Sequence, residues 1–278
     1  MLVRVEAIGV NYRDVYERER EGYGTDAPGI LGAEAGGTTA DGERLVWSRT
    51  PASYAEQVAV PRGAAVPIPD GVSTEVAVAA LLQGMTAHYL VHDSYPVARG
   101  DRVLVHAAAG GVGNLVVQLA KLRGAYVFAT ASSDEKRSLA REAGADEALS
   151  YEDAAARAHE LDVAAVYDGV GRTTFAAGLD ALRPTGRMIL YGSSSGEPEP
   201  VDPRTLAAKG SLYLQRPTLA TYTRTPALLR ERAAALFALI AAGDLHVRVG
   251  RRYPLAEARL AHEDLEARRT VGKLLLVP

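Results

Sequence analysis

Small residues stand at the spacing of a phosphate-binding turn near the middle of this 278-residue chain. Ala108, Gly110 and Gly113 occupy the three key positions of a G-x-G-x-x-G fingerprint, with alanine in place of the first glycine. Small side chains let the backbone turn sharply and approach a pyrophosphate, and the last glycine lets the following helix lie close to its strand. The pattern therefore predicts a dinucleotide whose phosphates lie at the N-terminus of a helix.

The segments on either side of this turn strengthen the prediction. The apolar run 103–105 predicts a buried parallel strand, and a helix is expected from about Val112 to Arg123. The apolar run 125–131 predicts a second strand, which completes a βαβ unit. A glycine turn of some other α/β domain, without a bound phosphate, is the alternative.

The tip of the second strand indicates which dinucleotide is bound. Sites for NAD usually place Asp or Glu there, where the carboxylate accepts a hydrogen bond from the ribose 2′-hydroxyl. Thr130–Ser133 contains no carboxylate, and Lys136 and Arg137 follow it. Hydroxyls and cations suit the 2′-phosphate of NADPH, which we therefore predict. Asp134 is the competing feature: it could reach the ribose, or it could cap the helix while Lys136 and Arg137 are solvated.

The order of the apolar segments predicts two kinds of region. Before Ser73 the chain is expected to be β-rich, and separate helices are expected over Ser73–Leu82 and from Met85. From Arg102 strands and helices alternate, which is typical of a doubly wound parallel sheet. The other expected strands are Leu2–Ala7, Glu43–Ser48, Tyr54–Val60, Ala148–Tyr151, Val163–Asp168, Arg187–Tyr191 and Ser211–Arg216, and the run Leu274–Pro278 is expected to pair in the first region.

Composition excludes several classes of protein. A length of 278 residues with 47% hydrophobic content is enough for one large or two modest domains. The net charge of −3 and the lack of a basic block make nucleic acid or an anionic membrane an unexpected partner. The chain has no cysteine, which excludes disulfides and thiolate catalysis. The first residues do not resemble a signal peptide and no apolar run reaches membrane-spanning length, so we expect a cytoplasmic protein.

Five motifs, taken together, resemble the zinc-free quinone oxidoreductases (zeta-crystallin-like proteins) of the medium-chain dehydrogenase/reductase superfamily. They are Gly9–Tyr16, Leu82–His88, Val105–Gly113, Tyr167–Gly171 and Tyr191–Gly196. The resemblance covers nearly the whole chain. It implies an α/β fold in which a Rossmann NADPH-binding domain, 85–217, is inserted in a GroES-like substrate domain made of 1–84 and 218–278, and it implies a homodimer. The GroES-like domain is expected to be abbreviated, because a β segment before residue 2 and an insertion after residue 36 are missing.

The resemblance also implies roles for individual residues. Asn11 and Thr86 would lie at the nicotinamide end of the cofactor, and Tyr16 would border the substrate pocket. The other cofactor-binding residues are expected in three groups: Ala109, Gly110, Gly111, Val112 and Gly113 at the pyrophosphate; Ser132, Lys136, Tyr151 and Arg268 around the 2′-phosphate; and Tyr191, Gly192 and Ser193 along the cofactor cleft. For Tyr151 and Arg268 a plain surface position is the alternative.

A zinc site is not expected. His88 and His92 are four residues apart on a predicted helix, but no Glu completes an H-E-x-x-H pattern and no cysteine is available. Zinc-dependent relatives have a Gly-His-Glu motif where this chain has Gly-Ala-Glu at 32–34. We therefore interpret both histidines as ordinary helix residues.

The predicted reaction is hydride transfer from NADPH to a quinone or another conjugated carbonyl compound. A quinone needs little acid catalysis, because its reduced oxygens can take protons from water. Asn11, Tyr12 and Tyr16 are the candidate catalytic residues, and either tyrosine could donate a proton to an enone or enoyl thioester. Two alternatives stay open: an enoyl reductase acting on acyl thioesters, which Asn11–Val15 and Val127–Ser132 also resemble, and a non-catalytic NADPH-binding protein.

Overall fold

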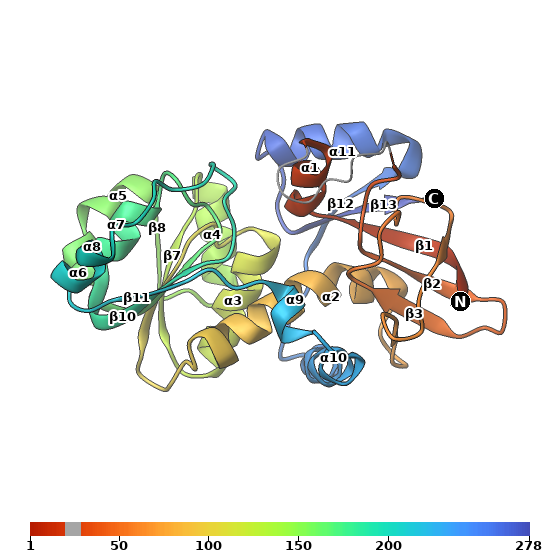
Figure 1. Ribbon diagram of the computed structural model, residues 1–278, viewed down its shortest axis with the longest axis horizontal. Coiled ribbons are helices and arrows are strands. Elements are labelled where there is room, and N and C mark those ends of the chain that lie inside the picture. The colour runs from red at the N-terminus through yellow and green to blue at the C-terminus, as the bar shows by residue number, and fades with distance from the viewer. Residues whose placement is uncertain (20–28) are drawn as a thin grey trace. The chain divides into compact units, whose positions relative to one another are not determined.

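The computed structural model describes residues 1–19 and 29–278 and contains two compact units (Figure 1). The terminal unit consists of Met1–Met85 and Tyr222–Pro278, and the central unit consists of Thr86–Thr221. One unit holds a parallel sheet and the other a largely antiparallel sheet, so the predicted α/β fold class is confirmed. Both ends of the chain belong to the terminal unit.

The central unit is built on a six-stranded sheet with the strand order β11-β10-β9-β6-β7-β8. All neighbouring strands in it are parallel. Numbered along the chain from β6, the order is 3-2-1-4-5-6 read from β8, which is the order of dinucleotide-binding doubly wound sheets. The strands are β6 (Arg102–Val105), β7 (Tyr126–Thr130), β8 (Glu147–Leu149), β9 (Val163–Asp168), β10 (Leu182–Leu190) and β11 (Tyr213–Gln215).

Helices cover both faces of this sheet, as Figure 1 shows. Strand β9 is buried over its whole length, which explains its unbroken apolar run. Apolar side chains of β9, β10 and α7 form one core cluster with Leu161 and Leu212. The helices that follow the π-helical turn η1 (Leu90–Ser94) are α3 (Gly111–Leu122), α4 (Asp134–Glu142), α5 (Tyr151–Ala156), α6 (Ala158–Leu161), α7 (Phe175–Asp180), α8 (Pro203–Ala208) and α9 (Leu219–Tyr222).

The terminal unit is built on a seven-stranded sheet with the order β12-β13-β1-β2-β3-β5, with β4 paired to β1. The last strand pairs antiparallel with the first, Ile8 opposite Leu276 and Val10 opposite Leu274, so the chain ends meet as expected. The fully buried Trp47 and Leu45 lie in its core. The strands are β1 (Leu2–Val10), β2 (Ala35–Thr39), β3 (Arg44–Trp47), β4 (Gln57–Ala59), β5 (Val66–Pro67), β12 (Val249–Pro254) and β13 (Lys273–Val277).

Two sequence predictions were wrong in detail. The separate helices expected on either side of residue 84 are one helix, α2. A Cβ on Gly84 would lie 2.6 Å from a Leu236 methyl group, so the glycine permits close packing there instead of breaking the helix. Tyr151 begins a helix instead of ending a strand, because the Ser150 hydroxyl accepts a hydrogen bond from the Asp153 amide and caps α5. The helices of the terminal unit are α1 (Tyr12–Glu19), α2 (Thr74–Tyr89, of which residues 86–89 belong to the central unit), α10 (Pro226–Ala241), the 3₁₀ turn η2 (Leu255–Glu257) and α11 (Ala258–Glu266).

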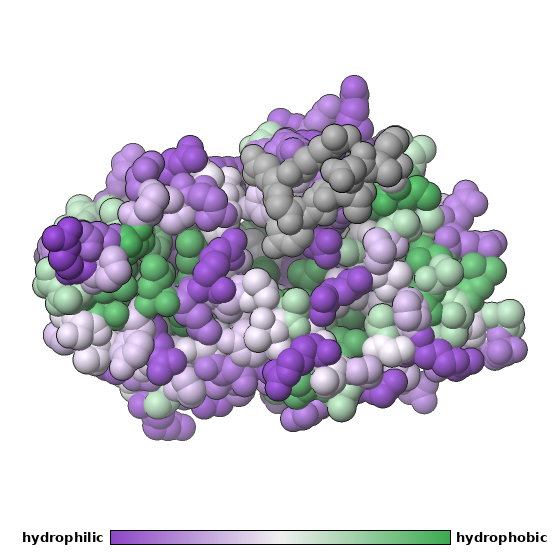
Figure 2. All heavy atoms as spheres, in the orientation of Figure 1, coloured by the Kyte–Doolittle hydropathy of each residue, from purple (hydrophilic) through white to green (hydrophobic). Residues whose placement is uncertain are grey.

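Hydrophilic side chains cover much of the face seen in Figure 2, with smaller apolar patches between them. In the described part of the chain, no helix has both the length and the apolar character that crossing a membrane would require.

Candidate functional site

The glycine fingerprint forms a tight turn between β6 and α3. Ala107 adopts a left-handed conformation with φ of 52°, and its carbonyl oxygen accepts a hydrogen bond from the Gly110 amide at 2.9 Å. A Cβ on Gly113 would lie only 2.4 Å from that same oxygen, and a Cβ on Gly110 would lie 3.1 Å from it. The turn before the helix therefore requires glycine at position 113. We had expected the requirement to come from close packing of the helix against its strand.

The first backbone amides of α3 form a candidate anion-binding site. Within the described residues, the backbone N–H groups of Gly111, Val112 and Gly113 have no hydrogen-bond partner. The N-cap residue Gly110 supplies no side-chain acceptor, and the first turn contains no acidic residue. Free amides and the positive end of the helix dipole together favour a phosphate. These residues fit the diphosphate of a dinucleotide.

The region expected to hold the 2′-phosphate follows β7. Ser132 is exposed, Lys136 is half-buried, and the Ser133 hydroxyl caps α4 by accepting from the Lys136 amide. The expectation that Asp134 caps the helix was therefore wrong. Arg137 pairs with Asp134 and also donates to the Ala131 carbonyl, so its guanidinium is already engaged. Ser132 and Lys136 are the residues of this segment that could meet a phosphate.

Tyr151 and His106 lie near each other at the same edge of the sheet. Their ring centroids are 6.1 Å apart, and His106 Nδ1 is 2.8 Å from the Thr130 hydroxyl. His106 is buried, and burial lowers the pKa of its imidazole, which favours the neutral ring. Thr130 was expected among the hydroxyls at the end of its strand, but the sequence did not indicate that Thr130 contacts His106. They connect the ends of β6 and β7 beneath Tyr151.

The ends of β9 and β10 complete this edge. Asp168 accepts hydrogen bonds from the amides of Val170 and Gly171 at 2.7 and 3.0 Å, which holds the loop after β9. Gly192 fits against Gly169, because a Cβ there would lie 2.8 Å from the Gly169 carbonyl oxygen. Apart from Thr86 on helix α2, the predicted cofactor residues of the central unit follow carboxyl ends of parallel strands, which is where doubly wound sheets bind ligands.

Two residues after β10 show what holds that segment. Tyr191, which we expected along the cofactor cleft, donates its amide to the Asp168 carbonyl at 2.8 Å. The buried Ser193 donates its hydroxyl to Glu197 at 2.6 Å, a partner that the sequence did not indicate. The Ser193 hydroxyl is therefore held in place by its own loop.

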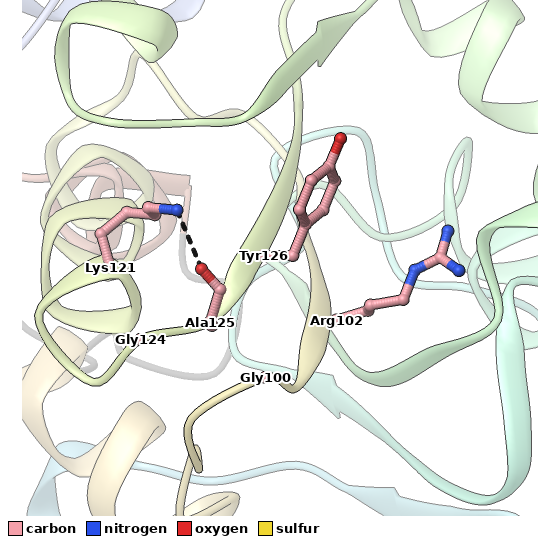
Figure 3. Close-up of a pocket in the computed structure, with 6 residues that line it drawn as sticks. All are labelled: Gly100, Arg102, Lys121, Gly124, Ala125 and Tyr126. Carbon is pink, nitrogen blue, oxygen red and sulfur yellow. Dashed lines mark hydrogen bonds between the residues drawn. The ribbon is translucent and has the colours of Figure 1, made fainter.

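A pocket of about 580 Å³ lies at the opposite, amino-terminal edge of the sheet (Figure 3). Two of its polar side chains are hydrogen-bonded: Lys121 Nζ donates to the Ala125 carbonyl at 2.9 Å and to Asp146 at 2.7 Å, and Tyr126 donates to Glu147. Gly100, Arg102 and Gly124 complete the lining. None of the predicted cofactor residues lines this pocket.

Asn11 lies in a buried polar cluster of the terminal unit. Its side-chain amide donates to the Gly9 carbonyl at 3.1 Å and to Glu34 at 3.0 Å, and its carbonyl oxygen accepts from Lys273 at 2.6 Å. Lys273 and Glu34 form an ion pair at 2.5 Å with side chains that are 1% and 0% exposed. A buried ion pair of this kind fixes the orientation of the groups that bond to it. Glu34 and Lys273 are functional-site candidates that the sequence motifs did not reveal.

The remaining predicted residues lie on separate elements. Tyr12 and Tyr16 are neighbours on α1 with ring centroids 5.5 Å apart, and burial, followed by the neighbouring Tyr16, raises the pKa of Tyr12. Thr86 is buried on α2. Arg268 is exposed in a left-handed conformation after α11, with φ of 56°. The adjacent Arg269 donates to Asp264 at 2.6 Å, so Arg268 and Arg269 lie in different environments.

Among the described acids of this unit, Asp14 has the largest pKa shift. It is fully buried on α1, and burial raises the pKa of its carboxyl to about 6. Its Oδ2 accepts from the Asn11 amide at 2.9 Å and from the Tyr54 hydroxyl at 3.2 Å, and its Oδ1 has no hydrogen-bond partner among the described residues.

This raised pKa predicts a specific pH dependence of stability. A carboxyl whose pKa is higher in the folded than in the unfolded protein stabilises the fold at low pH, and this contribution is lost as the pH rises from about 4 through about 6. Asp14→Asn removes the titration while keeping the acceptor. The quantity to compare is the melting temperature of Asp14→Asn minus that of the parent protein. We expect this difference to be a few degrees larger at pH 7.5 than at pH 5. A difference between the two proteins that is constant with pH in calorimetry would contradict this.

Comparison with known proteins gives consistent results. The profile of a family described as zinc-binding dehydrogenase matches residues 111–234. A quinone oxidoreductase of Pseudomonas aeruginosa is 39% identical over 99% of this chain and 90% of the relative, and quinone oxidoreductase 1 of Escherichia coli is 37% identical over the same shares. Among solved structures, a mycobacterial protein complexed with NADPH has a TM-score of 0.95 at 45% identity, covering 100% of this chain and 91% of that one.

The residues present do not fit a zinc ion. Ala33 stands where a zinc-ligating histidine would be expected, and the adjacent Glu34 is committed to Lys273. His88 and His92 stack face to face with centroids 4.0 Å apart, and His92 Nδ1 is 2.9 Å from the His88 carbonyl oxygen. Over residues 1–19 and 29–278, no group of three or more His, Cys, Asp or Glu side chains is placed to hold a metal.

Proposed function

This chain belongs to the quinone oxidoreductase family of the medium-chain dehydrogenase/reductase superfamily, and from that membership we propose that it transfers a hydride from NADPH to a quinone or another conjugated carbonyl compound. The observation that carries the proposal is the N-terminus of α3. Three backbone amides there have no hydrogen-bond partner among the described residues, they lie at the positive end of the helix dipole, and the first turn contains no carboxylate that would repel a phosphate. A quinone oxidoreductase of Escherichia coli with a TM-score of 0.95 is complexed with NADPH.

NADPH, when bound, supplies the hydride, and the residues of this chain bind and orient it. In the proposed site the amides of Gly111, Val112 and Gly113 bind the diphosphate. Ser132, Lys136 and Tyr151 bind the 2′-phosphate end, together with Arg268. Asn11, held by Lys273 and Glu34, and Thr86 orient the nicotinamide end.

Purified protein assayed with NADPH and a panel of benzoquinones, enones and crotonyl thioesters tests the proposal. Preferential turnover of the quinones supports it. The 34% identity to a 2-haloacrylate reductase of Burkholderia, over 90% of that relative, makes a conjugated acid or carbonyl the second candidate acceptor. Preference for the crotonyl thioester would favour an enoyl reductase instead. NADPH binding without turnover would favour a non-catalytic cofactor-binding protein.

Lys136 is expected to set the preference for NADPH over NADH. Lys136→Ala should raise the KM for NADPH by about 10- to 100-fold, the value of a lost charge-assisted hydrogen bond, and leave the KM for NADH unchanged. Lys121→Ala is the matched control, because Lys121 is another partly buried lysine of the central unit but lies at the opposite edge of the sheet. Equal losses with both cofactors in steady-state assays of Lys136→Ala would rule out contact with the 2′-phosphate.

We also propose that the protein acts in the cytoplasm as a homodimer. Strand β11 lies at an edge of the six-stranded sheet, and its Tyr213 and Leu214 are 58% and 39% exposed. An edge strand with exposed apolar side chains favours pairing with the same strand of a second copy.

A further inference from the structure

A line of hydrogen-bonding side chains crosses the terminal unit from α1 to α11. The Tyr54 hydroxyl lies between two partners, 3.2 Å from Asp14 Oδ2 and 2.9 Å from His262 Nε2. The other imidazole nitrogen of His262, Nδ1, is 3.5 Å from an Arg18 nitrogen, and the same nitrogen donates to Glu266 at 2.8 Å. Carboxyl, phenol and imidazole are thus joined in one continuous path.

The path leads from solvent into the core. The Arg18 and Glu266 side chains are 37% and 34% exposed, whereas His262 is 3% exposed and Asp14 is fully buried. Burial lowers the pKa of His262 and raises that of Asp14 to about 6. The two shifts have opposite signs, so burial favours the neutral imidazole at the outer end of the path and the protonated carboxyl at its inner end.

The donors and acceptors along the path are consistent in either of two directions. With Asp14 ionised, Arg18 donates to His262 Nδ1, His262 Nε2–H donates to Tyr54, and Tyr54 donates to Asp14. With Asp14 protonated, Asp14 donates to Tyr54, Tyr54 donates to His262 Nε2, and the proton of His262 lies on Nδ1. Arg18, whose nitrogen is 3.5 Å from Nδ1 and can only donate, must then turn away from it. One proton that enters at Nδ1 thus appears at the Asp14 carboxyl without any heavy atom crossing the core.

The inner end of the path is bonded to a residue with a predicted role in the reaction. Asp14 Oδ2 also accepts the backbone N–H of Asn11 at 2.9 Å, and Asn11 is the residue expected at the nicotinamide end. Asp14 Oδ1 has no hydrogen-bond partner among the described residues, although Arg13 Nε lies 3.9 Å from it. In contrast, the raised pKa of Tyr12 makes that tyrosine a poorer acid than an ordinary phenol.

Charged groups from every neighbouring element act on this path. Arg13 Nε is 3.9 Å from Asp14 Oδ1, and Lys273 also favours the Asp14 carboxylate. Burial first, then Asp14, and then Glu17 and Glu34 raise the pKa of Tyr54 well above its ordinary value, so it stays a neutral phenol. At His262, Arg18 disfavours the imidazolium and Glu266 favours it.

We propose that Asp14, Tyr54 and His262 form a proton relay that brings one proton from solvent to the reduced acceptor. The inference rests on the proposed function. Hydride addition places two electrons and one hydrogen on the quinone and leaves a hydroquinone monoanion. The Asp14 O–H bond breaks as the new O–H bond of the hydroquinone forms, directly or through one water, and Asp14 becomes a carboxylate. Tyr54 and His262 then each pass one proton inward, and water at the surface returns a proton to His262.

Two quinones with different proton demand test the relay. An alkyl-substituted benzoquinone gives a weakly acidic hydroquinone that must be protonated, whereas a dichlorobenzoquinone gives a far more acidic one that tolerates the anionic product. We expect Tyr54→Phe and His262→Gln to lower kcat about 100-fold with the alkyl quinone, since about 100-fold is the smallest typical contribution of general acid–base catalysis. With the dichloroquinone, kcat should fall less than about threefold. In the parent protein, kcat with the alkyl quinone alone should fall as the pH rises above about 6.

Tyr253→Phe is the matched control. Tyr253 is another buried tyrosine of the terminal unit and donates to Asp264 of α11 at 2.7 Å, but it lies outside the relay. This variant should retain parental kcat with both quinones. Equal losses with the two quinones in Tyr54→Phe and His262→Gln, or a parental kcat for the alkyl quinone that is independent of pH, would overturn the relay alone. If the parent protein binds NADPH but reduces neither quinone, the proposed function fails as well. If Tyr54→Phe does not fold, the relay is still tested by the pH profile of the parent protein and by His262→Gln, which keeps the tyrosine.

Discussion

Replacing Gly113 with alanine is expected to lower the affinity for NADPH by more than about 100-fold. The new methyl group would lie 2.4 Å from the Ala107 carbonyl oxygen and 3.0 Å from the carbon of that carbonyl. Both are backbone atoms and cannot rotate away, so the turn and the first amides of α3 must move. Misplacement of binding groups by about 1 Å is enough to cost about 10²-fold. Titration of the protein with NADPH, followed by fluorescence or calorimetry, measures the loss.

Two further glycine variants separate this effect from general strain. Gly110→Ala would place its methyl group 3.1 Å from the same oxygen, so a smaller loss, about tenfold, is expected. Gly100→Ala is the control, because Gly100 has φ of 86° and open space around it. It should cost about 1 to 2 kcal/mol of folding stability and leave the NADPH affinity unchanged. Near-parental affinity in Gly113→Ala would show that the turn yields without moving the amides.

Replacing Lys273 with methionine is expected to destabilise the terminal unit by about 3 to 5 kcal/mol. The change removes one partner of an ion pair whose side chains are 1% and 0% exposed, and it leaves the Glu34 carboxylate buried without a cation. Asn11 also loses the donor to its carbonyl oxygen, so the activity of the folded fraction should fall. Denaturant unfolding and steady-state kinetics of the variant measure the two effects.

A double variant and a surface pair serve as controls. Glu34→Gln combined with Lys273→Met removes the buried charge, so part of the lost stability should return. Arg252 pairs with Glu75 at 2.6 Å, but their side chains are 53% and 37% exposed. Arg252→Met should therefore cost less than about 1 kcal/mol. If Lys273→Met is no more harmful than Arg252→Met, the buried pair does not hold the unit together.

The architecture of the central unit was largely predictable because its signals are local. The runs at 103–105, 125–131 and 163–168 are apolar because parallel strands are covered on both faces, and the small residues between Ala108 and Gly113 mark the turn. The errors were also local. At Tyr151 and Asp134 a serine one residue earlier caps the helix, and cap choice among neighbouring polar residues depends on backbone geometry.

The polar clusters of the terminal unit were not predictable, since their members are distant in the sequence. Glu34 and Lys273 meet through the pairing of β1 with β2 and β13, and the sequence around either residue does not indicate the other as its partner. Asp14 lies inside a recognised motif, but its partners Tyr54 and His262 come from opposite halves of the chain. The cofactor-binding and catalytic roles assigned to individual residues stay predictions, which the variants above address.

The pairing of β1 with β13 determines when each part of the protein can fold during synthesis. The central unit is one continuous segment, residues 86–221, and has all of its strands once that segment has left the ribosome. Strand β1 is made before the central unit but waits for its antiparallel partner, Leu274–Leu276, which is made after that unit. Until Lys273 has been made, the Glu34 carboxylate of the buried pair lacks its cation. We therefore expect the nascent chain to carry a finished nucleotide-binding unit beside an open sheet edge, the stage at which a chaperone would be needed most.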